Sequence, residues 1–329
     1  MKFSKRLRYV RYFFEYLAVL AFYFFIRILP HSTLFPIADF IGGLFFLLPS
    51  VRKLLCANIK VAFPEKDSCE VRRIASKSAS NLVLALLEFF WFVNRPEMLD
   101  KYVGFPKNER DITEKNRKAG HGLIWATPHI GNWELAGLKF KHDANIPFAV
   151  VVRPLNNFFL NRIIHSGRVS EGSRVIPDKG AVKGMMKALK DGCFVATLVD
   201  QNTRAREGGV FVDFFGLPVP TSRVPALFAR KLDTPVAVGG CIRKGRRYEM
   251  FAEELPKLPA EYGSDEELIQ DIMEITEKII RRYPDQYLWL YKRWLYIPEN
   301  ATDEQRKRYP FYSVNVTPRF FSELAPKGQ

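Results

Sequence analysis

The fold class is decided by the stretch GLIWATPHIGNWELAGL, residues 122–138. Its first part, residues 122–128, is an apolar run of strand length, whereas the pattern after Gly131 is helical. A strand that passes through a short turn into a helix is the repeating unit of α/β proteins. The turn carries His129, and Glu134 follows five residues later. This end of a strand is where α/β enzymes often place a general base and the group that orients it.

Strand-like and helix-like segments alternate from residue 122 onward. The predicted strands are 123–127, 148–152, 174–176, 194–199, 236–241 and 248–252. The predicted helices are 132–142, 157–169, 181–190, 224–232 and 265–282. Lys244-Gly245 joins the last two strands as a hairpin, so that part should be antiparallel. We therefore predict an α/β fold in which helices flank a central mixed, largely parallel sheet.

The N-terminal segment predicts a hydrophobic membrane-anchor helix. Five basic residues and no acidic one occupy the opening eleven positions, and the aromatic-rich apolar segment 12–29 follows. As a helix this segment reaches about 27 Å, close to the roughly 30 Å hydrocarbon core of a bilayer. The next apolar segment, 34–48, either pairs with the first as a re-entrant hairpin or packs on the soluble domain. A cleavable signal peptide is disfavoured, because no small-x-small cleavage pattern follows.

The basic start of the chain also predicts the orientation of the anchor. Under the positive-inside rule the N-terminus is cytoplasmic. A single span would then place the main domain outside, whereas a hairpin or an in-plane anchor keeps it in the cytosol, which we favour. The predicted domains are a membrane anchor at 1–50, a catalytic domain at 51–298 and a polar C-terminal tail at 299–329. Residues 300–329 should be loosely held.

Composition restricts the partners and cofactors. The net charge of +15 favours an anionic lipid surface or an acidic protein, and no nucleic-acid-binding module is recognisable. The four cysteines are scattered, which argues against disulfides and structural zinc and fits a reducing cytosol. The chain lacks the Walker A, G-x-G-x-x-G, G-x-S-x-G and H-E-x-x-H motifs. We therefore predict neither a metal nor another cofactor.

Polar residues follow several of the predicted strands. His129 follows the first strand, Arg153 the second, and Asp200 with Gln201 comes after 194–199. Ligands in parallel sheets bind beyond the carboxyl ends of strands. A base, a cation for developing negative charge and a positioning carboxylate together fit enzymatic chemistry, although each alone is also typical of an ordinary surface.

Two further segments have alternative interpretations. The apolar run 82–93 predicts either a buried core helix or a wall that holds an acyl chain. The segment 203–221, rich in glycine, proline, arginine and phenylalanine, predicts either a long functional loop or a β-excursion with packed phenylalanines.

Residues 127–134 resemble the H-x4-D/E motif of the lysophospholipid-type acyltransferase superfamily. More narrowly, the chain resembles the lipid A biosynthesis late acyltransferases (lauroyl/myristoyl transferases) of Gram-negative bacteria. The other matching segments are 58–64, Arg153-Pro154, Asp200-Gln201, 213–218, 284–289 and Arg293-Trp294. The resemblance runs from the N-terminal apolar segment to about residue 298.

This resemblance implies a glycerol-phosphate-acyltransferase-like fold and acyl transfer from acyl carrier protein to a hydroxyl of a lipid A precursor. The reaction would take place at the inner face of the cytoplasmic membrane, whose anionic lipid suits the basic chain. His129 would be the general base and Glu134 would accept a hydrogen bond from its other ring nitrogen. A glutamate stands here where aspartate is more widespread.

The resemblance also assigns residues that bind substrate or stabilise an oxyanion. Arg153 would face the thioester oxyanion or a lipid phosphate, and the backbone near Gly131 and Asn132 could share that task. Asp200 and Gln201 would support the arrangement from a neighbouring strand end. The acceptor hydroxyl is itself the nucleophile, so no covalent acyl-enzyme is needed.

Other functions remain open on the sequence alone. The same O-acyl transfer could serve another glycolipid, an aminolipid or a lysophospholipid, and coenzyme A could carry the acyl group. A non-catalytic, basic membrane-binding protein that keeps the fold is the alternative of a different class. Neither the acyl chain length nor the acylated hydroxyl follows from the sequence.

Overall fold

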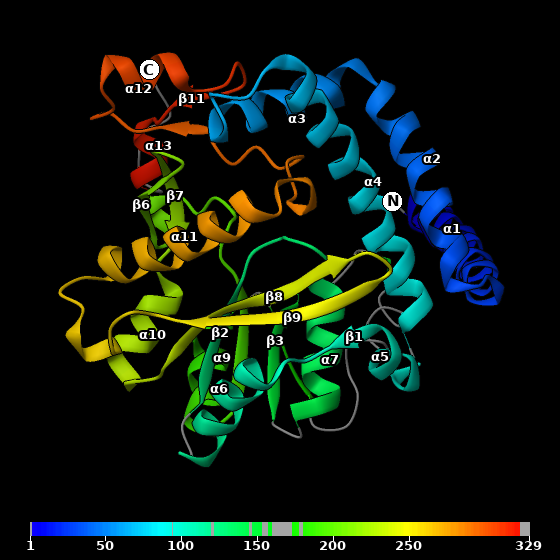
Figure 1. Cartoon of the computed structure of the whole chain (residues 1–329), viewed down its shortest axis with the longest axis horizontal. Coiled ribbons are helices and arrows are strands. Elements are labelled where there is room, and N and C mark those ends of the chain that lie inside the picture. Colours follow the sequence, from blue (N-terminus) through cyan, green and yellow to red (C-terminus); the bar gives the residue numbers. More distant parts are fainter. Residues whose placement is uncertain are drawn as a thin grey trace.

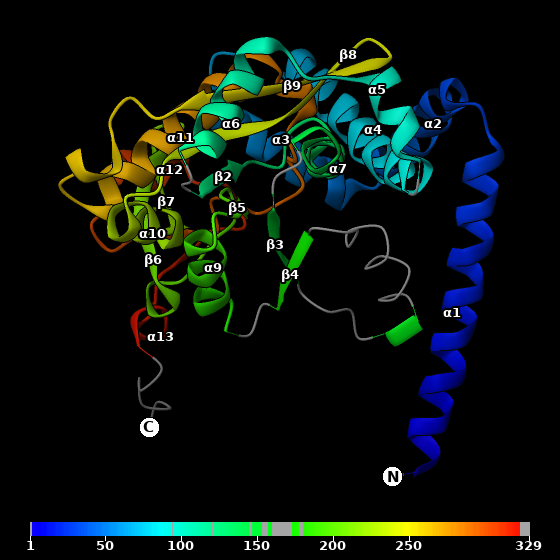
Figure 2. The same cartoon turned by 90° about the horizontal axis from the view of Figure 1, so that it is seen from below.

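The structure is a computed structural model of the chain that describes residues 2–93, 95–119, 122–144, 147–152, 157–159, 173–177 and 180–322. An α/β domain forms its centre, with helices on both faces of a twisted sheet (Figure 1). The N-terminal helices lie at one side of this domain, and the long helix α1 (Lys2–Ile28) stands along its edge (Figure 2).

The central sheet has seven strands in the order β1-β9-β8-β2-β5-β3-β4. Their bounds are β1 Val103–Gly104, β2 Leu123–Thr127, β3 Phe148–Val152, β4 Ser173–Pro177, β5 Phe194–Leu198, β8 Val236–Lys244 and β9 Arg247–Glu254. All neighbours pair in parallel except β8 and β9, which form the antiparallel hairpin. The predicted mixed, largely parallel sheet is confirmed.

Strand β2 lies in the middle of the sheet, and all five of its residues are buried. Ile124 and Ala126 join the hydrophobic core on one face, while Leu123 and Trp125 join the core on the other. A central parallel strand is covered on both faces, which explains its unbroken apolar sequence. The Trp125 ring needs Gly239 on β8, because a Cβ there would lie 2.1 Å from the ring.

The helices that cover the sheet confirm most of the predicted ranges. They are α5 Pro96–Tyr102, α6 Lys107–Lys118, α7 Trp133–Ala144, α9 Ala181–Lys190, α10 Val224–Leu232 and α11 Asp265–Arg282. Helix α7 contributes to the core on one face of the sheet, and α9 and α11 contribute to the core on the other. The predicted helix 157–169 lies outside the described residues except for 157–159.

The N-terminal helices are α1, α2 (Leu34–Leu47), α3 (Pro49–Ala62) and α4 (Ser68–Phe92). Within α1, residues 8–28 are long and apolar enough to cross a membrane, and only 6% of this window is buried. The second apolar segment, α2, packs along α4, so it covers the domain (Figure 1). The pair formed by α2 with its preceding turn and α3 passes the same test as one span, bent by 95°. The run 82–93 forms the C-terminal part of α4 up to Phe92 and is largely buried, as the core-helix interpretation predicted.

The segment 203–221 is a β-excursion rather than a long loop. Strands β6 (Gly209–Phe214) and β7 (Leu217–Ser222) form an antiparallel hairpin. Phe214 is fully buried and stacks on Trp294 with 5.7 Å between ring centroids. The interpretation with packed phenylalanines is therefore confirmed.

The C-terminal segment is packed against the domain up to residue 322. It contains β10 (Tyr296–Ile297), α12 (Asp303–Arg308), β11 (Val314–Asn315) and α13 (Pro318–Phe321). The Tyr309 hydroxyl donates to the carbonyl of Pro218 at 2.6 Å, and Phe320 is buried and stacks on Phe211. The expectation of a loosely held tail is wrong for residues 300–322, because aromatic side chains spaced along this polar segment fill positions beside the hairpin β6–β7.

Candidate active site

The candidate site begins at the turn between β2 and α7, residues 128–132. Gly131 has a positive φ of 61°, and a Cβ there would lie 1.8 Å from the carbonyl oxygen of Cys241. Its N–H donates to the carbonyl of Gln286 at 2.9 Å, and the N–H of Leu288 donates to the carbonyl of His129 at 3.0 Å. The turn is thus clamped between β8 and the segment after α11, and only glycine fits at its closest point.

His129 is held by Asp200, which follows β5. The ring Nδ1 lies 2.7 Å from Oδ1 of Asp200, and the backbone N–H of His129 donates to Oδ2 at 2.8 Å. His129 is 7% exposed and Asp200 is 3% exposed. An ionised carboxylate only accepts hydrogen bonds, so Nδ1 carries the proton and Nε2 is the nitrogen that can accept one.

The electrostatics of this pair follow from burial and its charged neighbours. Burial lowers the pKa of His129, but the charge and hydrogen bond of Asp200 and the charge of Glu134 outweigh it, so the pKa lies above the ordinary value. Burial raises the pKa of Asp200, yet His129 and the nearby Arg293 hold it below the ordinary range. Asp200 therefore stays ionised and favours the protonated imidazole.

Two buried side chains beyond Asp200 complete its surroundings. Burial and the negative charge of the nearby Asp200 raise the pKa of the Tyr287 phenol well above its ordinary value. Arg293 is 1% exposed and donates to Asn202 Oδ1 and to the carbonyl of Pro220, both at 3.0 Å. Arg293 lies in a segment whose sequence resembles the acyltransferases, but the sequence alone assigns it no role. The signal was a cation inside an aromatic-rich segment, where burial needs a nearby anion.

Glu134 lies in the first turn of α7 and lines a cavity beside the turn. It acts on His129 through its charge, while the hydrogen-bond partner of Nδ1 is Asp200. The five-residue spacing nominates Glu134 as the orienting carboxylate, and the structure brings a second carboxylate from another strand end to the ring. Both lie close enough to influence the imidazole.

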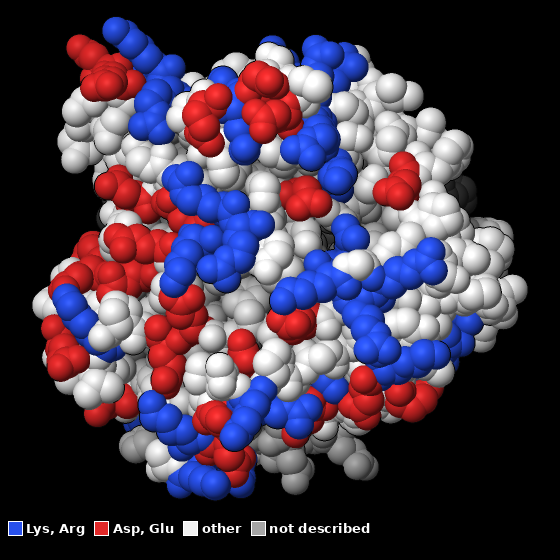
Figure 3. All heavy atoms as spheres, in the orientation of Figure 1, with Lys and Arg blue, Asp and Glu red and all other residues white. Residues whose placement is uncertain are grey.

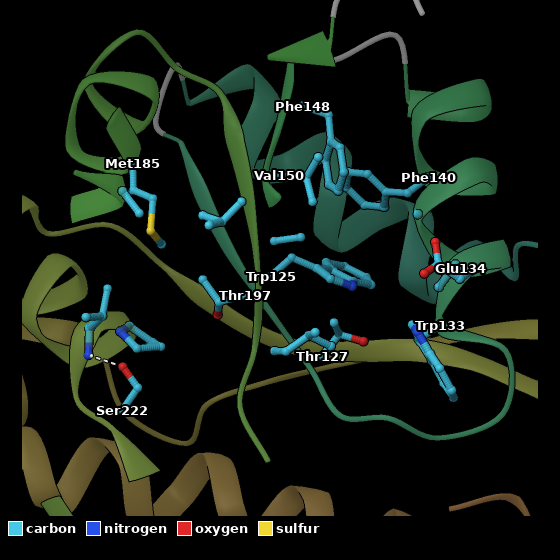
Figure 4. A pocket seen from close by; sticks show the side chains of 18 of the residues that line it. Trp125, Thr127, Trp133, Glu134, Phe140, Phe148, Val150, Met185, Thr197 and Ser222 are labelled. Carbon is cyan, nitrogen blue, oxygen red and sulfur yellow. Dashed lines mark hydrogen bonds between the residues drawn. The ribbon is translucent and has the colours of Figure 1, made fainter. Parts of the chain in front are cut away.

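The cavity has a volume of about 420 Å³, within the usual range of roughly 300–1,000 Å³ for ligand pockets. Trp133 and Glu134 lie at one side of it, and apolar side chains from β2, β3, α7 and α9 form most of the wall (Figure 4). The wall residues include Trp125, Ala136, Phe140, Phe148, Val150, Met185 and Leu198. The ring of His129 packs edge-on against Trp133, with 5.0 Å between centroids. Because Trp133 lines the cavity, the cavity lies one side chain away from the His129–Asp200 pair. None of its lining residues belongs to α4.

The other predicted site residues have different surroundings. The N–H groups of Gly131 and Asn132 both donate to backbone carbonyls, so neither is available to an oxyanion in this conformation. The Asn132 side chain is fully buried. Gln201 is exposed at the end of β5, and Arg153 lies outside the described residues.

Among the described residues, one group of acidic and histidine side chains is compact enough for a metal ion, namely Asp100, His142 and Asp143. Lys139 already forms ion pairs with Asp100 at 2.7 Å and with Asp143 at 2.9 Å. Its ammonium group occupies the place of a cation, so these carboxylates are satisfied without a metal.

A buried histidine near an apolar cavity suits an enzyme that moves an acyl group, and comparison with known sequences gives the same class, the acyltransferases. The sequence profile of the family described as bacterial lipid A biosynthesis acyltransferase matches residues 1–296. The chain belongs to this family.

Individual relatives cover most of the chain. It is 24% identical over 308 residues to the lipid A biosynthesis lauroyltransferase of Escherichia coli K12, which covers 91% of this chain and 97% of that protein. It is also 24% identical to the lipid A biosynthesis palmitoleoyltransferase of the same strain, over 89% of this chain and 94% of that protein. A phosphatidylinositol mannoside acyltransferase of Mycolicibacterium smegmatis is 27% identical over 58% of this chain and 61% of its own length.

Proposed function

We propose that this enzyme transfers a fatty acyl group from acyl carrier protein to a hydroxyl of a lipid A precursor at the cytoplasmic face of the inner membrane. The observation that carries the proposal is the buried His129–Asp200 pair beside an apolar cavity, in a chain of the lipid A acyltransferase family. The mostly parallel sheet supports a glycerol-phosphate-acyltransferase-like fold.

The first step is the attack of the acceptor hydroxyl on the thioester. His129 Nε2 takes the hydroxyl proton as the oxygen forms a bond to the thioester carbonyl carbon. Asp200 accepts a hydrogen bond from Nδ1–H and stabilises the imidazolium that forms. The raised pKa of His129 supports this role. Glu134 adds a second negative charge beside the ring and lines the cavity where the substrates meet.

The second step is the collapse of the tetrahedral intermediate. The carbonyl is restored as the carbon–sulfur bond breaks, and the imidazolium returns its proton to the departing thiolate. The products are an ester on the lipid and the free thiol of the carrier. Arg153 is our candidate for the cation that stabilises the oxyanion or binds a lipid phosphate, since the N–H groups of Gly131 and Asn132 are engaged.

The remaining features support the choice of substrates. The apolar cavity suits an acyl chain, and the exposed apolar helix α1 brings the enzyme to an acceptor that resides in a membrane. The net charge of +15 suits a phosphorylated glycolipid, anionic membrane lipid and an acidic carrier protein. Lysine and arginine side chains form bands across the centre and right of the face seen in Figure 1 (Figure 3).

A second candidate function is the same transfer to a different glycolipid. The similarity to a phosphatidylinositol mannoside acyltransferase favours it, because that relative acts on a mannoside and matches more than half of this chain. The proposed chemistry at His129 is the same for both acceptors, so only the acceptor site differs.

The test uses the purified full-length enzyme in detergent micelles with dodecanoyl-acyl carrier protein. Lipid A precursor, phosphatidylinositol mannoside and lysophospholipid serve as separate acceptors, and mass spectrometry detects the added acyl group. We expect transfer to the lipid A precursor, and His129→Ala should lower kcat about 10²–10⁴-fold. The exposed His142→Ala is the matched control and should retain activity.

Each outcome decides between the assignments. Transfer only to the mannoside would assign the second candidate function. Transfer by His129→Ala at the wild-type rate would remove His129 from the mechanism, and transfer to none of the acceptors would overturn the proposal.

A further inference from the structure

A second buried carboxylate, Glu88 in α4, lies outside the proposed chemistry. It is 0% exposed, and three donors surround it. His31 Nε2 lies 2.8 Å from Oε1, while the Asn132 amide and the Tyr248 hydroxyl donate to Oε2 at 2.9 Å and 2.5 Å. These donors come from the N-terminal helices, the turn 128–132 and the sheet. Glu88 therefore joins three parts of the molecule at one point.

His31 belongs to the anchor corner, which we define as residues 29–33 between α1 and α2. It is 4% exposed and surrounded by the aromatic rings of Phe35, Trp91, Phe92 and Tyr102, with centroids 4.3–5.5 Å away. The described hydrogen-bond partner of the imidazole is Glu88. An imidazole in such apolar surroundings needs a polar partner, so this hydrogen bond fixes the ring.

A second contact holds the same corner on α4. The indole N–H of Trp91 donates to the carbonyl of Leu29 at 2.9 Å. The corner where α1 leaves the domain is thus fastened to the helix that carries Glu88. The position of the anchor corner and the position of the Glu88 carboxylate depend on each other.

At the other end of the network, Asn132 sets the start of α7. Its Oδ1 accepts from the N–H of Leu135 at 3.1 Å, which is an N-cap bond, and its Nδ2 donates to Glu88. Because both ends of the amide are engaged, Glu88 fixes the rotamer that caps the helix. The first turn of α7 carries Trp133 and Glu134, which adjoin His129.

We propose that Glu88 is a positioning residue that ties the anchor corner, through His31, to the turn that carries the catalytic histidine. The N-terminal helices then form part of the framework of the active site in addition to holding the enzyme at a membrane. This inference rests on the proposed acyl transfer with His129 as the base.

The test compares two substitutions of His31 that are similar in length and volume. His31→Gln keeps an N–H donor for Glu88, whereas His31→Met fills the aromatic surroundings without a donor. Both should bind vesicles of anionic phospholipid like wild type. His31→Met should lower the melting temperature, because it removes a hydrogen bond from the buried Glu88 carboxylate, so all variants are assayed well below their unfolding transitions. We expect His31→Met to lower kcat about tenfold with unchanged KM for the acyl donor, below the ~100-fold cost of displacing a catalytic group. We expect His31→Gln to recover most of kcat.

A double-mutant cycle on kcat tests whether the effect passes through Glu88. If it does, His31→Met combined with Asn132→Ala should lose little more than Asn132→Ala alone, because both break the same chain of hydrogen bonds. Independent roles would give losses that multiply. The substitution His142→Ala, at the exposed histidine of α7, again serves as the control.

Three results would overturn the inference. The first is equal kcat for His31→Gln and His31→Met, and the second is losses that multiply in the cycle. The third is a loss of kcat explained by weaker vesicle binding or by unfolding of the variant at the assay temperature. Failure of the proposed function is distinguishable, because His129→Ala would then keep its activity. If His129→Ala is inactive and the losses in the cycle multiply, the proposed function stands and only the coupling through Glu88 is rejected.

Discussion

Two buried histidine–carboxylate pairs lie in the part of the chain that the structure describes, and they differ in their surroundings. His129 meets Asp200 at 2.7 Å and His31 meets Glu88 at 2.8 Å, and each of these side chains is at most 9% exposed. The ring of His129 packs against Trp133, a residue of the cavity wall. The ring of His31 is enclosed by aromatic side chains.

We propose that contact with the cavity wall, rather than the chemical groups, separates a reactive pair from a structural one. Glu88 is bound by donors from three elements, and neither these donors nor the aromatic rings around His31 line the described cavity. His129, in contrast, packs directly against Trp133, which lines it. Asp200 binds His129 through the backbone and one ring nitrogen, which leaves the other nitrogen for a proton. The following predictions test this difference.

The largest difference in kcat should appear when the histidine of each pair is replaced by glutamine. His129→Gln should lower kcat about 10³–10⁴-fold, because an amide cannot take the proton of the acceptor hydroxyl. His31→Gln should stay within about threefold of wild type, because its amide still donates to Glu88. Steady-state assays with acylated acyl carrier protein as the donor measure kcat of both variants. Similar losses in the two variants would contradict the division into a reactive and a structural pair.

A smaller effect is expected for Asp200→Asn. The amide can accept from Nδ1–H or from the backbone N–H of His129, but its NH₂ group then faces the other donor. We expect kcat/KM to fall about 10²–10³-fold, below the ~10⁴ found for the equivalent change in a Ser-His-Asp triad. The charge of Asp200 raises the pKa of His129, so its removal should move the acid limb of kcat/KM to lower pH. An unmoved limb would show that Asp200 does not act on the base.

The cavity that distinguishes the first pair can be narrowed. Ala136 lines it and is 3% exposed, so Ala136→Phe should shorten the space for an acyl chain. We expect kcat/KM for hexadecanoyl donors to fall about 10–100-fold, with a smaller loss for octanoyl donors. The exposed Ala119→Phe is the control for an added ring. An equal loss for both donors would place the acyl chain elsewhere.

The sequence predicts the framework of the candidate site because the signals for it are local. The apolar run of β2 and the break at Gly131 predict where β2 ends and α7 begins, and strand ends nominate His129 and Asp200. It could not decide which carboxylate binds Nδ1. The positive φ of Gly131 reverses the chain, so the distance between His129 and Glu134 is not set by their spacing.

The Glu88 network could not be predicted for a different reason. A lone carboxylate in the apolar run 82–93 indicates a buried partner but does not identify one. Its donors are 44 to 160 residues away in the sequence. Only the packing of α4 against the anchor corner, the turn and β9 brings them together.

The smallest expected effect concerns the stability of the His129–Asp200 pair as a function of pH. The pKa of Asp200 is lowered in the folded state. Its contribution to the free energy of unfolding is therefore present above about pH 3.9 and is lost as the pH falls through the folded-state pKa. The pKa of His129 is raised in the folded state. Its contribution to the free energy of unfolding is therefore present below about pH 6.5 and is lost as the pH rises through the folded-state pKa. Both contributions coexist between these limits.

Wild type should therefore exceed Asp200→Asn in melting temperature by more at pH 6.0 than at pH 8.5. We expect the gap to differ by about 2–4 °C, which corresponds to ~1 kcal/mol in a domain of 150–250 residues. Thermal unfolding in detergent, followed by circular dichroism in matched buffers, measures it. An equal gap at both pH values would mean that the imidazole and the carboxylate interact as a neutral hydrogen bond. The assignment of a charged pair, which supports His129 as the base, would then be wrong.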